Sequence, residues 1–309
     1  MAGGVKNYVA EVDAAGGDKL RAALAGRGWE IDAIPYARFR AKKDKTTIAV
    51  YESGKLVVQG KGTEEIVQFL IEPDILGKAT LGYEREIAKE ERPDMFRPHA
   101  GIDESGKGDY FGPLVVAAVY VDGETSQALF DAGVADSKTI GSDKRIANLA
   151  GKIKAIVGDA WSVVPIGPSA YNRLYDSIGN VNKLLAWGHA RVLENLLEKV
   201  PGCPRAVSDQ FGRKETVLKA LLKAGRTIEL EQYPKAEKDI AVAAASILAR
   251  DEFVRRLERL GSAAGQKLPK GAGANVIAAG RAMIKTHGRG GLAEFAKTHF
   301  KTTDNILFG

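Results

Sequence analysis

The sequence predicts an α/β protein that carries a smaller α+β domain in front of it. After residue 99, short apolar runs alternate with helical patterns, which is typical of a sheet covered by helices. Before residue 75, the order is one strand, one helix, three strands and one helix, which indicates a small α+β domain. One hydrophobic core rarely grows beyond about 250 residues. A chain of 309 residues therefore has room for both domains.

The first domain is expected at residues 1–75, and residues 76–98 are expected to link it to a second domain at 99–309. The linker prediction depends on the stretch 83–93, which is rich in charge, has few apolar positions and ends at Pro93, a residue that stops helices. Within the first domain, strands are expected at 7–12, 37–42, 46–51 and 55–59, and helices at 18–25 and 63–71.

The strand at 37–42 carries the binding signal of the first domain. Because side chains alternate between the two faces of a strand, one aromatic and three basic residues are expected on one side. These residues are Tyr36, Arg38, Arg40 and Lys42. Such a face suits a phosphate backbone, and a solvated strand face is the equally weighted alternative. No cluster of acids or histidines accompanies it, so we expect binding rather than chemistry here.

The second domain contains the apolar run Leu114–Val121, which suits a buried strand. The helix expected at 240–260 contains Ala241–Arg250, whose many small residues indicate tight packing against its neighbours. Further strands are expected at 161–166, 205–211 and 227–233, and further helices at 144–157, 181–200 and 214–223.

Acidic residues lie beside three of these strands. Asp103 and Glu104 border the first strand, Asp209 ends a second, and Glu237 lies just past a third. Sites in α/β sheets form at strand ends, and carboxylates gathered there repel one another unless a cation neutralises them. Hard divalent cations bind through carboxylate oxygens, so the sequence predicts a site for two magnesium ions that act on a phosphodiester. For any one acid taken alone, a helix cap or a surface charge is the more common role.

A glycine-rich loop follows the first two acids. Gly106 and Gly108 flank Lys107, which lets the backbone approach a polyanion closely. The spacing from Gly101 to Lys107 matches a P-loop, but Gly108 then stands where a hydroxyl would bind magnesium. Acids inside the phosphate cradle would also repel a nucleotide, so we reject the P-loop interpretation.

Composition narrows the class of protein. The net charge of +6 and the pI near 9.2 favour a polyanionic partner. Cys203 is the one cysteine, which excludes an internal disulfide and a cysteine-based zinc site and fits a reducing compartment. Neither a signal peptide nor an apolar run of roughly 20 residues is present. We expect a cytoplasmic monomer that does not bind membranes.

The stretch Asp103–Pro113, Asp-Glu-Ser-Gly-Lys-Gly-Asp-Tyr-Phe-Gly-Pro, closely resembles the signature of type 2 ribonucleases H. Further stretches that match the same family are 136–138, 235–237 and 243–250. The segment 268–273, the ending around His299 and Phe300 and the extra N-terminal domain resemble ribonuclease HIII. That subfamily has a ribonuclease H-like catalytic domain and a substrate-binding domain resembling the TATA-binding protein.

The resemblance implies endonucleolytic cleavage of the RNA strand in RNA–DNA hybrids, leaving 5′-phosphate and 3′-hydroxyl ends. It also implies two Mg²⁺ or Mn²⁺ ions, with Asp103 bridging both. The family's four acids map onto Asp103, Glu104, Asp209 and Glu237. Asp239 is an alternative for the fourth acid, although it better suits the cap of the following helix. Where relatives often carry an acid after the third position, this chain has Gln210.

The resemblance further implies that the loop Ser105, Gly106, Lys107 and Gly108 recognises RNA through backbone contacts to 2′-hydroxyls. Lys138 and Lys270 are the stronger candidates among the lysines for contacts to the substrate. No tyrosine that senses an RNA–DNA junction can be assigned, so activity on stretches of ribonucleotides is expected. The alternatives are ribonuclease HII-like cleavage at single embedded ribonucleotides and a non-catalytic hybrid-binding protein. The four histidines, His99, His189, His287 and His299, are expected to be structural.

Overall fold

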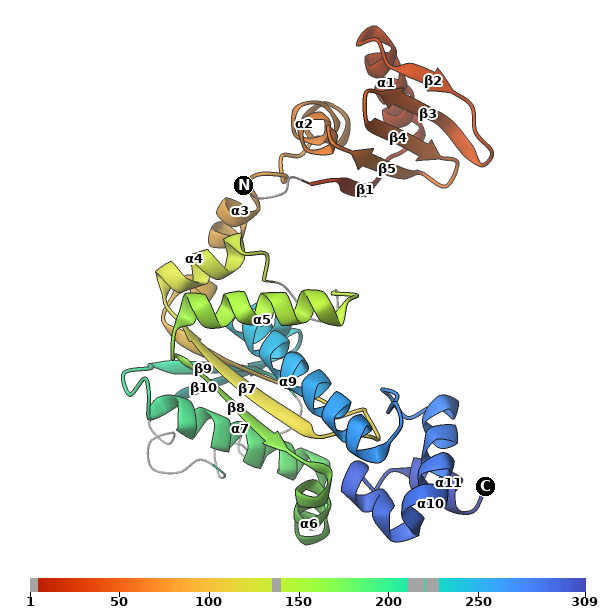
Figure 1. The fold of residues 1–309 in the computed structure, drawn as a ribbon. Helices are drawn as coiled ribbons and strands as arrows, with labels where there is room; N and C mark the ends of the chain where they lie inside the picture. Colours follow the sequence, from red (N-terminus) through yellow and green to blue (C-terminus); the bar gives the residue numbers. More distant parts are fainter. Residues whose placement is uncertain (1–4, 135–139, 211–219, 221–227) are drawn as a thin grey trace. The chain divides into compact units, whose positions relative to one another are not determined.

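The computed structural model of the chain describes residues 5–134, 140–210, 220 and 228–309. It divides into two compact units, Met1–Glu91 and Arg92–Gly309, each with a five-stranded sheet of its own (Figure 1). The division falls inside the segment 76–98 that we expected to link two domains. Most of that segment is helical, with α3 at Glu84–Glu91 and a short 3₁₀ turn, η2, at Pro93–Phe96.

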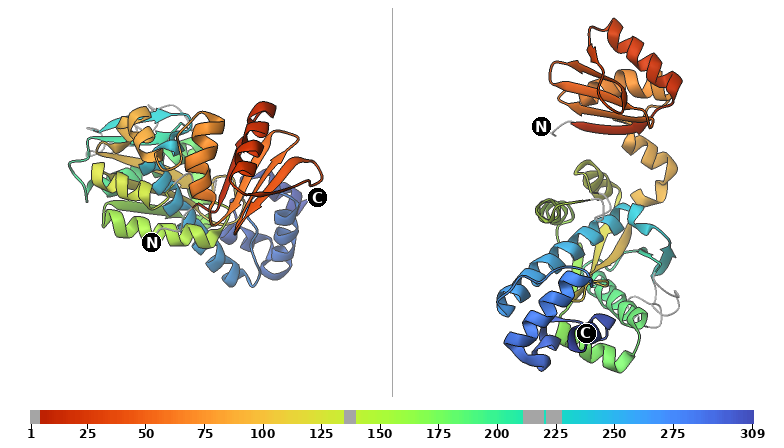
Figure 2. Two further views of the ribbon diagram at one scale, coloured as in Figure 1. Left: turned by 90° about the horizontal axis from the view of Figure 1, so that it is seen from above. Right: turned by 90° about the vertical axis from the view of Figure 1, so that its right-hand side faces the viewer.

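The first unit is an antiparallel sheet with helices on one side. Its strand order is β1-β5-β4-β3-β2. In the left view of Figure 2, the red helix α1 and the orange segment of α2 and η1 lie on the same side of the sheet. The strands are β1 (Asn7–Glu11), β2 (Glu30–Asp32), β3 (Ala37–Lys43), β4 (Thr46–Tyr51) and β5 (Lys55–Gly60). The helices are α1 (Ala14–Gly26), α2 (Thr63–Ile66) and its π-helical continuation η1 (Val67–Leu76).

The core of this unit lies between the helices and the sheet. Leu20 and Leu24 of α1 pack with Leu70 of η1 against Phe39 and Val58 of the sheet, and all five are buried. The predicted α+β architecture is therefore confirmed. Strand β2 was not predicted, because its three residues are too short to show an alternating pattern.

The second unit has a mixed sheet of order β10-β9-β6-β7-β8. Strands β6, β9 and β10 run parallel, whereas β7 is antiparallel to its neighbours β6 and β8. The bounds are β6 (His99–Ser105), β7 (Leu114–Val121), β8 (Trp161–Ile166), β9 (Arg205–Asp209) and β10 (Glu229–Tyr233). Strand β6 was not predicted. Asp103 and Glu104, expected at the border of the strand 114–121, lie instead inside β6, which pairs with that strand.

Helices cover both faces of this sheet (Figure 1). Helix α9 (Ile240–Ala264) lies on one face, with α5 (Asp143–Val157) beside it, and α7 (Val181–Leu197) lies on the other. These three confirm the helices expected at 144–157, 181–200 and 240–260. Four further helices were not predicted: α4 (Gly123–Asp131), α6 (Pro168–Ile178), α10 (Ala274–Phe295) and α11 (Lys301–Leu307). The helix expected at 214–223 lies outside the described residues, apart from Ala220.

The packing of α9 on β6 explains the small residues of that helix. A Cβ added to Gly101 would lie 2.2 Å from the Ala241 carbonyl carbon and from the Val242 nitrogen. The backbone of α9 therefore rests directly on the backbone of β6 at this glycine. Larger side chains on either element would force them apart. The prediction of a tightly packed helix is confirmed. Within the described part of the chain, no helix has the length and apolar character needed to cross a membrane.

Candidate active site

Asp103 and Glu104 are neighbours on β6, so their side chains point to opposite faces of the sheet. Asp103 lies on the face covered by α9 and forms a hydrogen bond with the Ser246 side chain. Glu104 lies on the face covered by α7, where its Oε2 is 3.0 Å from His189 Nε2. Each acid thus has a partner on the helix that covers its own face.

The environment of Asp103 disfavours its charge. Burial, followed by repulsion from Glu104, raises the pKa of Asp103 from 3.8 to about 7, although Ser246 and His189 partly oppose the shift. A buried carboxylate beside a second carboxylate is stabilised by a cation. The pair therefore has the chemistry of a binding site for a hard divalent ion.

Asp209 joins this edge of the sheet. It ends β9, which pairs with β6 in parallel, and Ser208 is the register partner of Ile102. One residue further along both strands, Asp209 falls beside Asp103. The sequence prediction that an acid ends this strand is confirmed.

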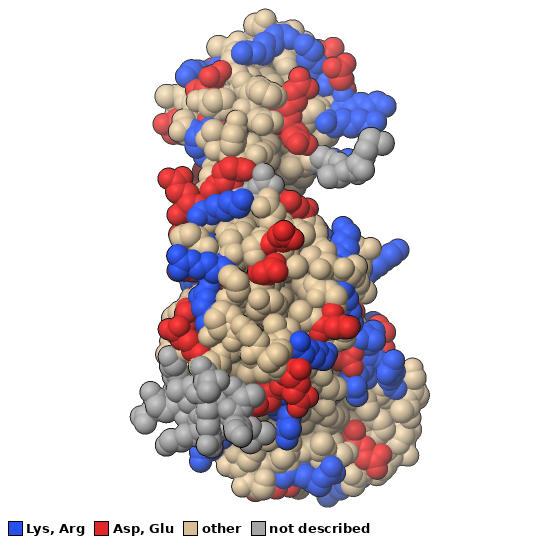
Figure 3. Space-filling view, turned by 90° about the vertical axis from the view of Figure 1, so that its left-hand side faces the viewer, with Lys and Arg blue, Asp and Glu red and all other residues tan. Residues whose placement is uncertain are grey.

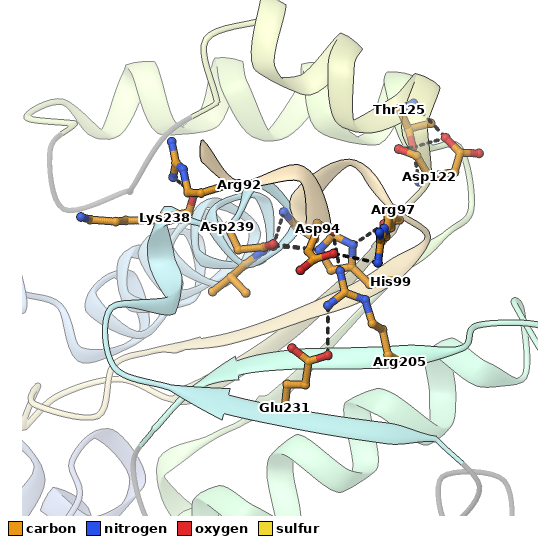
Figure 4. A network of polar contacts seen from close by, with 12 residues as sticks. Arg92, Asp94, Arg97, His99, Asp122, Thr125, Arg205, Glu231, Lys238 and Asp239 are labelled. Atoms are coloured by element: carbon orange, nitrogen blue, oxygen red, sulfur yellow. Dashed lines mark hydrogen bonds and ion pairs between the residues drawn. The ribbon is translucent and has the colours of Figure 1, made fainter. Parts of the chain in front are cut away.

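The two candidates for the fourth acid have different surroundings. Glu237 lies in the 3₁₀ turn η5 (Ala236–Lys238) and is partly exposed. Asp239 is buried, caps α9 by accepting hydrogen bonds from the Ala241 and Val242 nitrogens, and lies 2.9 Å from His99 Nε2 (Figure 4).

Asp239 is therefore committed to holding the fold. His99 begins β6, and Asp103 follows four residues later, roughly 13 Å away along an extended strand. Asp239 lies at the His99 end of that distance. The turn between Glu237 and Asp239 is held by Arg92, whose Nη1 donates to the Lys238 oxygen at 2.8 Å (Figure 4). Glu237 therefore stays the predicted fourth acid.

Asp103, Glu104 and Asp209 lie near the same ends of the neighbouring strands β6 and β9, but their side chains do not converge on one coordination site. Among the residues that the structure describes, no group of three or more histidine, cysteine, aspartate or glutamate side chains is arranged to hold a metal ion. The chemistry of Asp103, Glu104 and Asp209 fits a divalent cation, and their present arrangement is not that of a closed metal site.

The glycines of the loop after β6 have different roles. Gly106 has a φ of +88°, and a Cβ there would lie 2.2 Å from the Pro113 oxygen, so glycine is required. At Gly108 an added Cβ would meet nothing within 4 Å, and the residue is exposed. Between them, Lys107 is 43% exposed with its Nζ 3.9 Å from Glu104 Oε1.

The C-terminal part of the chain holds this loop in place. The sequence did not indicate these contacts. Asp109 accepts a hydrogen bond from the Gly271 nitrogen at 2.6 Å, and the Tyr110 nitrogen donates to the Gly271 oxygen at 2.8 Å. The Lys297 side chain is fully buried and donates to the Gly112 oxygen. A lysine in an Ala-Lys-Thr context carries no pattern that distinguishes it from a surface lysine.

Of the two remaining lysine candidates, the structure describes only Lys270. Lys270 pairs with Asp143 at the start of α5, with Nζ 2.7 Å from Oδ2. Lys138 lies outside the described residues. His189 and Ser246 contact the acidic pair and were not predicted to do so. Ser246 stands in a motif quoted above, whereas nothing in the sequence around His189 indicates a partner.

In the first unit, Arg40 and Lys42 lie on the sheet face opposite the helices. Both pair with Asp32 of β2: Arg40 through Nε at 2.9 Å and through its terminal nitrogen, and Lys42 with Nζ at 3.6 Å. Arg40 lowers the pKa of the Asp32 carboxyl through its hydrogen bond. Tyr36 precedes the strand and is 83% exposed. Part of the positive charge of this face is therefore balanced within the sheet.

The expectation that Arg38 shares this face is wrong. A β-bulge between Ala37 and Phe39 interrupts the alternation of β3. As a result, Arg38 Cδ comes within 3.9 Å of the position that a Cβ on Gly17 of α1 would take. Arg38 therefore turns toward the helices, while Arg40 and Lys42 remain on the open face.

Comparisons with known proteins agree with this architecture. The family model for ribonuclease HII matches residues 100–303, and a domain of unknown function, DUF3378, matches 7–80. Ribonuclease HIII of Chlamydia pneumoniae is 47% identical over 273 residues, which is 88% of each chain. Ribonuclease HIII of Protochlamydia amoebophila is 41% identical over 97% of this chain and 96% of its own. The crystal structure of Bst-RNase HIII in complex with Mn²⁺ matches with a TM-score of 0.66 at 33% identity, covering 97% of this chain and 98% of that one.

The mixed sheet, the acids on β6 and β9 and these matches define a type 2 ribonuclease H. Within that class, the chain belongs to the ribonuclease HIII family. It is accordingly a hydrolase, and the resemblance found in the sequence motifs is confirmed.

Proposed function

We propose that the chain is an endoribonuclease that cleaves the RNA strand of RNA–DNA hybrids and leaves 5′-phosphate and 3′-hydroxyl ends. One observation carries the proposal. Asp103, with its pKa raised to about 7 by burial and by Glu104, lies beside Asp209 at one strand edge. Such a group needs a cation as its partner, and the related Bst-RNase HIII was crystallised with Mn²⁺.

The cofactor in this proposal is Mg²⁺ or Mn²⁺, with two ions per site. Asp103, Glu104, Asp209 and Glu237 would hold them, with Asp103 shared. When bound, such ions polarise the phosphodiester, activate a water molecule and stabilise the leaving oxygen. Glu104 and Glu237 would complete the ligand set around Asp103 and Asp209.

The loop Ser105–Gly108 is proposed to test for RNA. Gly106 gives the loop its turn, and the open backbone at Gly108 can approach the sugar edge of a strand. Contacts to the 2′-hydroxyl distinguish RNA from DNA. Lys107, exposed within this loop, would contact a phosphate, and Lys138 keeps that role as a proposal from its motif.

The first unit is proposed to grip the hybrid through phosphate contacts from Arg40 and Lys42. On the face shown in Figure 3, basic and acidic side chains are interspersed among the described residues. On that face, therefore, the net positive charge does not form a continuous basic surface.

We further propose that the enzyme acts as a monomer in the cytoplasm. The four acids of the proposed site come from one chain. The single cysteine, Cys203, is buried, and burial raises the pKa of its thiol to about 11. An unreactive lone thiol fits a reducing compartment.

The test is cleavage of an end-labelled RNA–DNA hybrid with Mg²⁺, with Mn²⁺ and with a chelator. Wild-type protein should cut the RNA strand only with a metal ion. Asp103→Asn should abolish cutting while hybrid affinity stays within about twofold, because the basic groups that hold the phosphates are untouched. Cleavage by Asp103→Asn at the wild-type rate would refute the proposed role of the acid.

A second duplex, with one ribonucleotide embedded in DNA, separates the alternatives. Preferential cutting of this duplex would assign ribonuclease HII-like activity to the chain. Metal-dependent binding of the hybrid without any cutting would make the protein a non-catalytic hybrid binder.

A further inference from the structure

We propose that His189 is a positioning residue that orients the Glu104 carboxylate for metal binding. The proposal rests on the proposed function, since it assigns Glu104 to the metal site. His189 comes from α7, on the face of the sheet opposite Asp103, and therefore has no route to the substrate through the sheet. Its hydrogen bond is to Glu104, so its positioning role would run through that acid.

The contact is buried and specific. His189 is 1% exposed, the Glu104 side chain is 13% exposed, and Nε2 lies 3.0 Å from Oε2. An ionised carboxylate only accepts hydrogen bonds, so the proton of this bond belongs to Nε2. The other carboxylate oxygen, Oε1, faces the loop, 3.9 Å from Lys107 Nζ. One oxygen is thus held from inside the protein while the other faces the exposed loop.

A glycine brings the helix close enough for this bond. Gly188 precedes His189, and a Cβ there would lie 2.9 Å from Val116 Cγ2. Val116 is the cross-strand partner of Glu104 on β7. The absence of a side chain at Gly188 therefore lets α7 pack against β7 at the position beside Glu104. The helix approach and the histidine contact act on the same acid.

Orientation matters most for this acid. Adjacent residues of a strand face opposite sides, so Glu104 must extend around the strand edge to reach an ion that Asp103 also binds. A long, flexible side chain loses up to about 2 kcal/mol of conformational entropy on being held. A hydrogen bond that already fixes one oxygen reduces the entropy lost when metal binds. Ser246 supplies a comparable hydrogen bond to Asp103 on the other face.

The test compares three variants of the full-length chain by Mn²⁺ titration calorimetry, without substrate. His189→Ala should weaken Mn²⁺ affinity by about 10–100-fold, the range found for second partners of metal ligands. His189→Gln keeps an amide N–H near the Nε2 position and should recover most of that affinity. Leu193→Ala, a buried position of the same helix away from Glu104, should lower stability without changing Mn²⁺ affinity.

A double-mutant cycle isolates the route of the effect. If His189 acts through Glu104, His189→Ala should have no further effect on Mn²⁺ affinity in a Glu104→Gln background. Wild-type Mn²⁺ affinity in both His189 variants, or additive losses in the cycle, would overturn the inference. Absence of Mn²⁺ binding to the wild-type protein would instead overturn the proposed function, and the positioning role with it.

Discussion

The side-chain nitrogen of Lys297 donates a hydrogen bond to the main-chain oxygen of Gly112 at 2.8 Å, although the two residues are 185 positions apart. Main-chain bonds join the same segments, from the Lys297 nitrogen to the Tyr110 oxygen and from the Gly112 nitrogen to the Phe295 oxygen. The loop that follows the acidic pair is therefore held from behind by the C-terminal part of the chain.

Lys297 should make stability depend on pH. Burial lowers the pKa of Lys297 from 10.5 to about 7, with Asp109 opposing the shift. Between these values the unfolded chain binds one more proton than the folded chain, so stability rises with pH; below the lower value the full penalty of the buried charge is present. Lys297→Met should remove this rise. It should also leave the Gly112 oxygen unpaired, which costs about 1–3 kcal/mol. Urea unfolding between about pH 7 and pH 10 measures both effects.

The exposed Lys301 supplies the control for this experiment. Lys301→Met should leave the pH dependence unchanged, because an exposed lysine keeps similar surroundings in both states. Parallel pH profiles for the wild type and Lys297→Met would contradict the assignment.

Gly101→Ala should damage the whole second unit. The added Cβ would lie 2.2 Å from the backbone of α9, which cannot yield without moving off β6. Overpacking of this kind costs about 1–3 kcal/mol or more. Gly108→Ala is the matched control, because the same methyl group meets open space there. Thermal unfolding should separate the two variants by several degrees, and equal melting temperatures would show that α9 does not rest on the strand.

Alanine substitutions at Glu237 and Asp239 should have opposite consequences. Asp239→Ala removes the cap of α9, which costs about 1 kcal/mol. It also leaves the buried His99 without its hydrogen-bond partner, which costs about 1–3 kcal/mol more. Glu237→Ala should change stability by no more than about 0.5 kcal/mol, yet reduce cleavage by at least about 10–100-fold, since it removes a proposed metal ligand. Unfolding curves and cleavage rates of both variants are the measurements. Full activity in Glu237→Ala would exclude it as the fourth acid.

On the first unit, Arg40→Ala and Lys42→Ala should each weaken hybrid binding at all sequences and reduce the slope of log affinity against log salt by about one. Arg38→Ala removes the same charge from the helix side of β3 and should leave the slope nearly unchanged. Asp32→Asn should tighten binding at low salt, because it frees the two cations from their internal partner. If all four variants kept the wild-type slope of log affinity against log salt, this sheet face would not contact the hybrid.

Much of the fold followed from local patterns. The helices α5, α7 and α9 and strands such as β4 and β8 were predicted close to their observed bounds, because their apolar periodicity is strong over many residues. Strand β6 escaped prediction because its end carries two charged residues and its start carries a histidine. Its pairing with β7 and β9 on either side decides its conformation.

The alternation rule failed at Arg38 for a related reason. A bulge adds one residue to β3 relative to its partner, and a pattern of types along one strand cannot show where such an extra residue lies. The contacts of the opposite strand and of α1 decide the direction of that side chain.

The sequence by itself determined the class of chemistry, since Asp103, Glu104 and the glycine loop are contiguous and Asp209 ends a clear strand. Only the tertiary structure decided which side chains hold the site in place. His189 bonds to Glu104, His99 bonds to Asp239, and Lys297 bonds to the main chain of the loop at Gly112. These partners are 85, 140 and 185 residues away in the chain. Hydrogen bonds require atoms within about 3 Å, a condition that strand order and helix packing set and that local sequence does not encode.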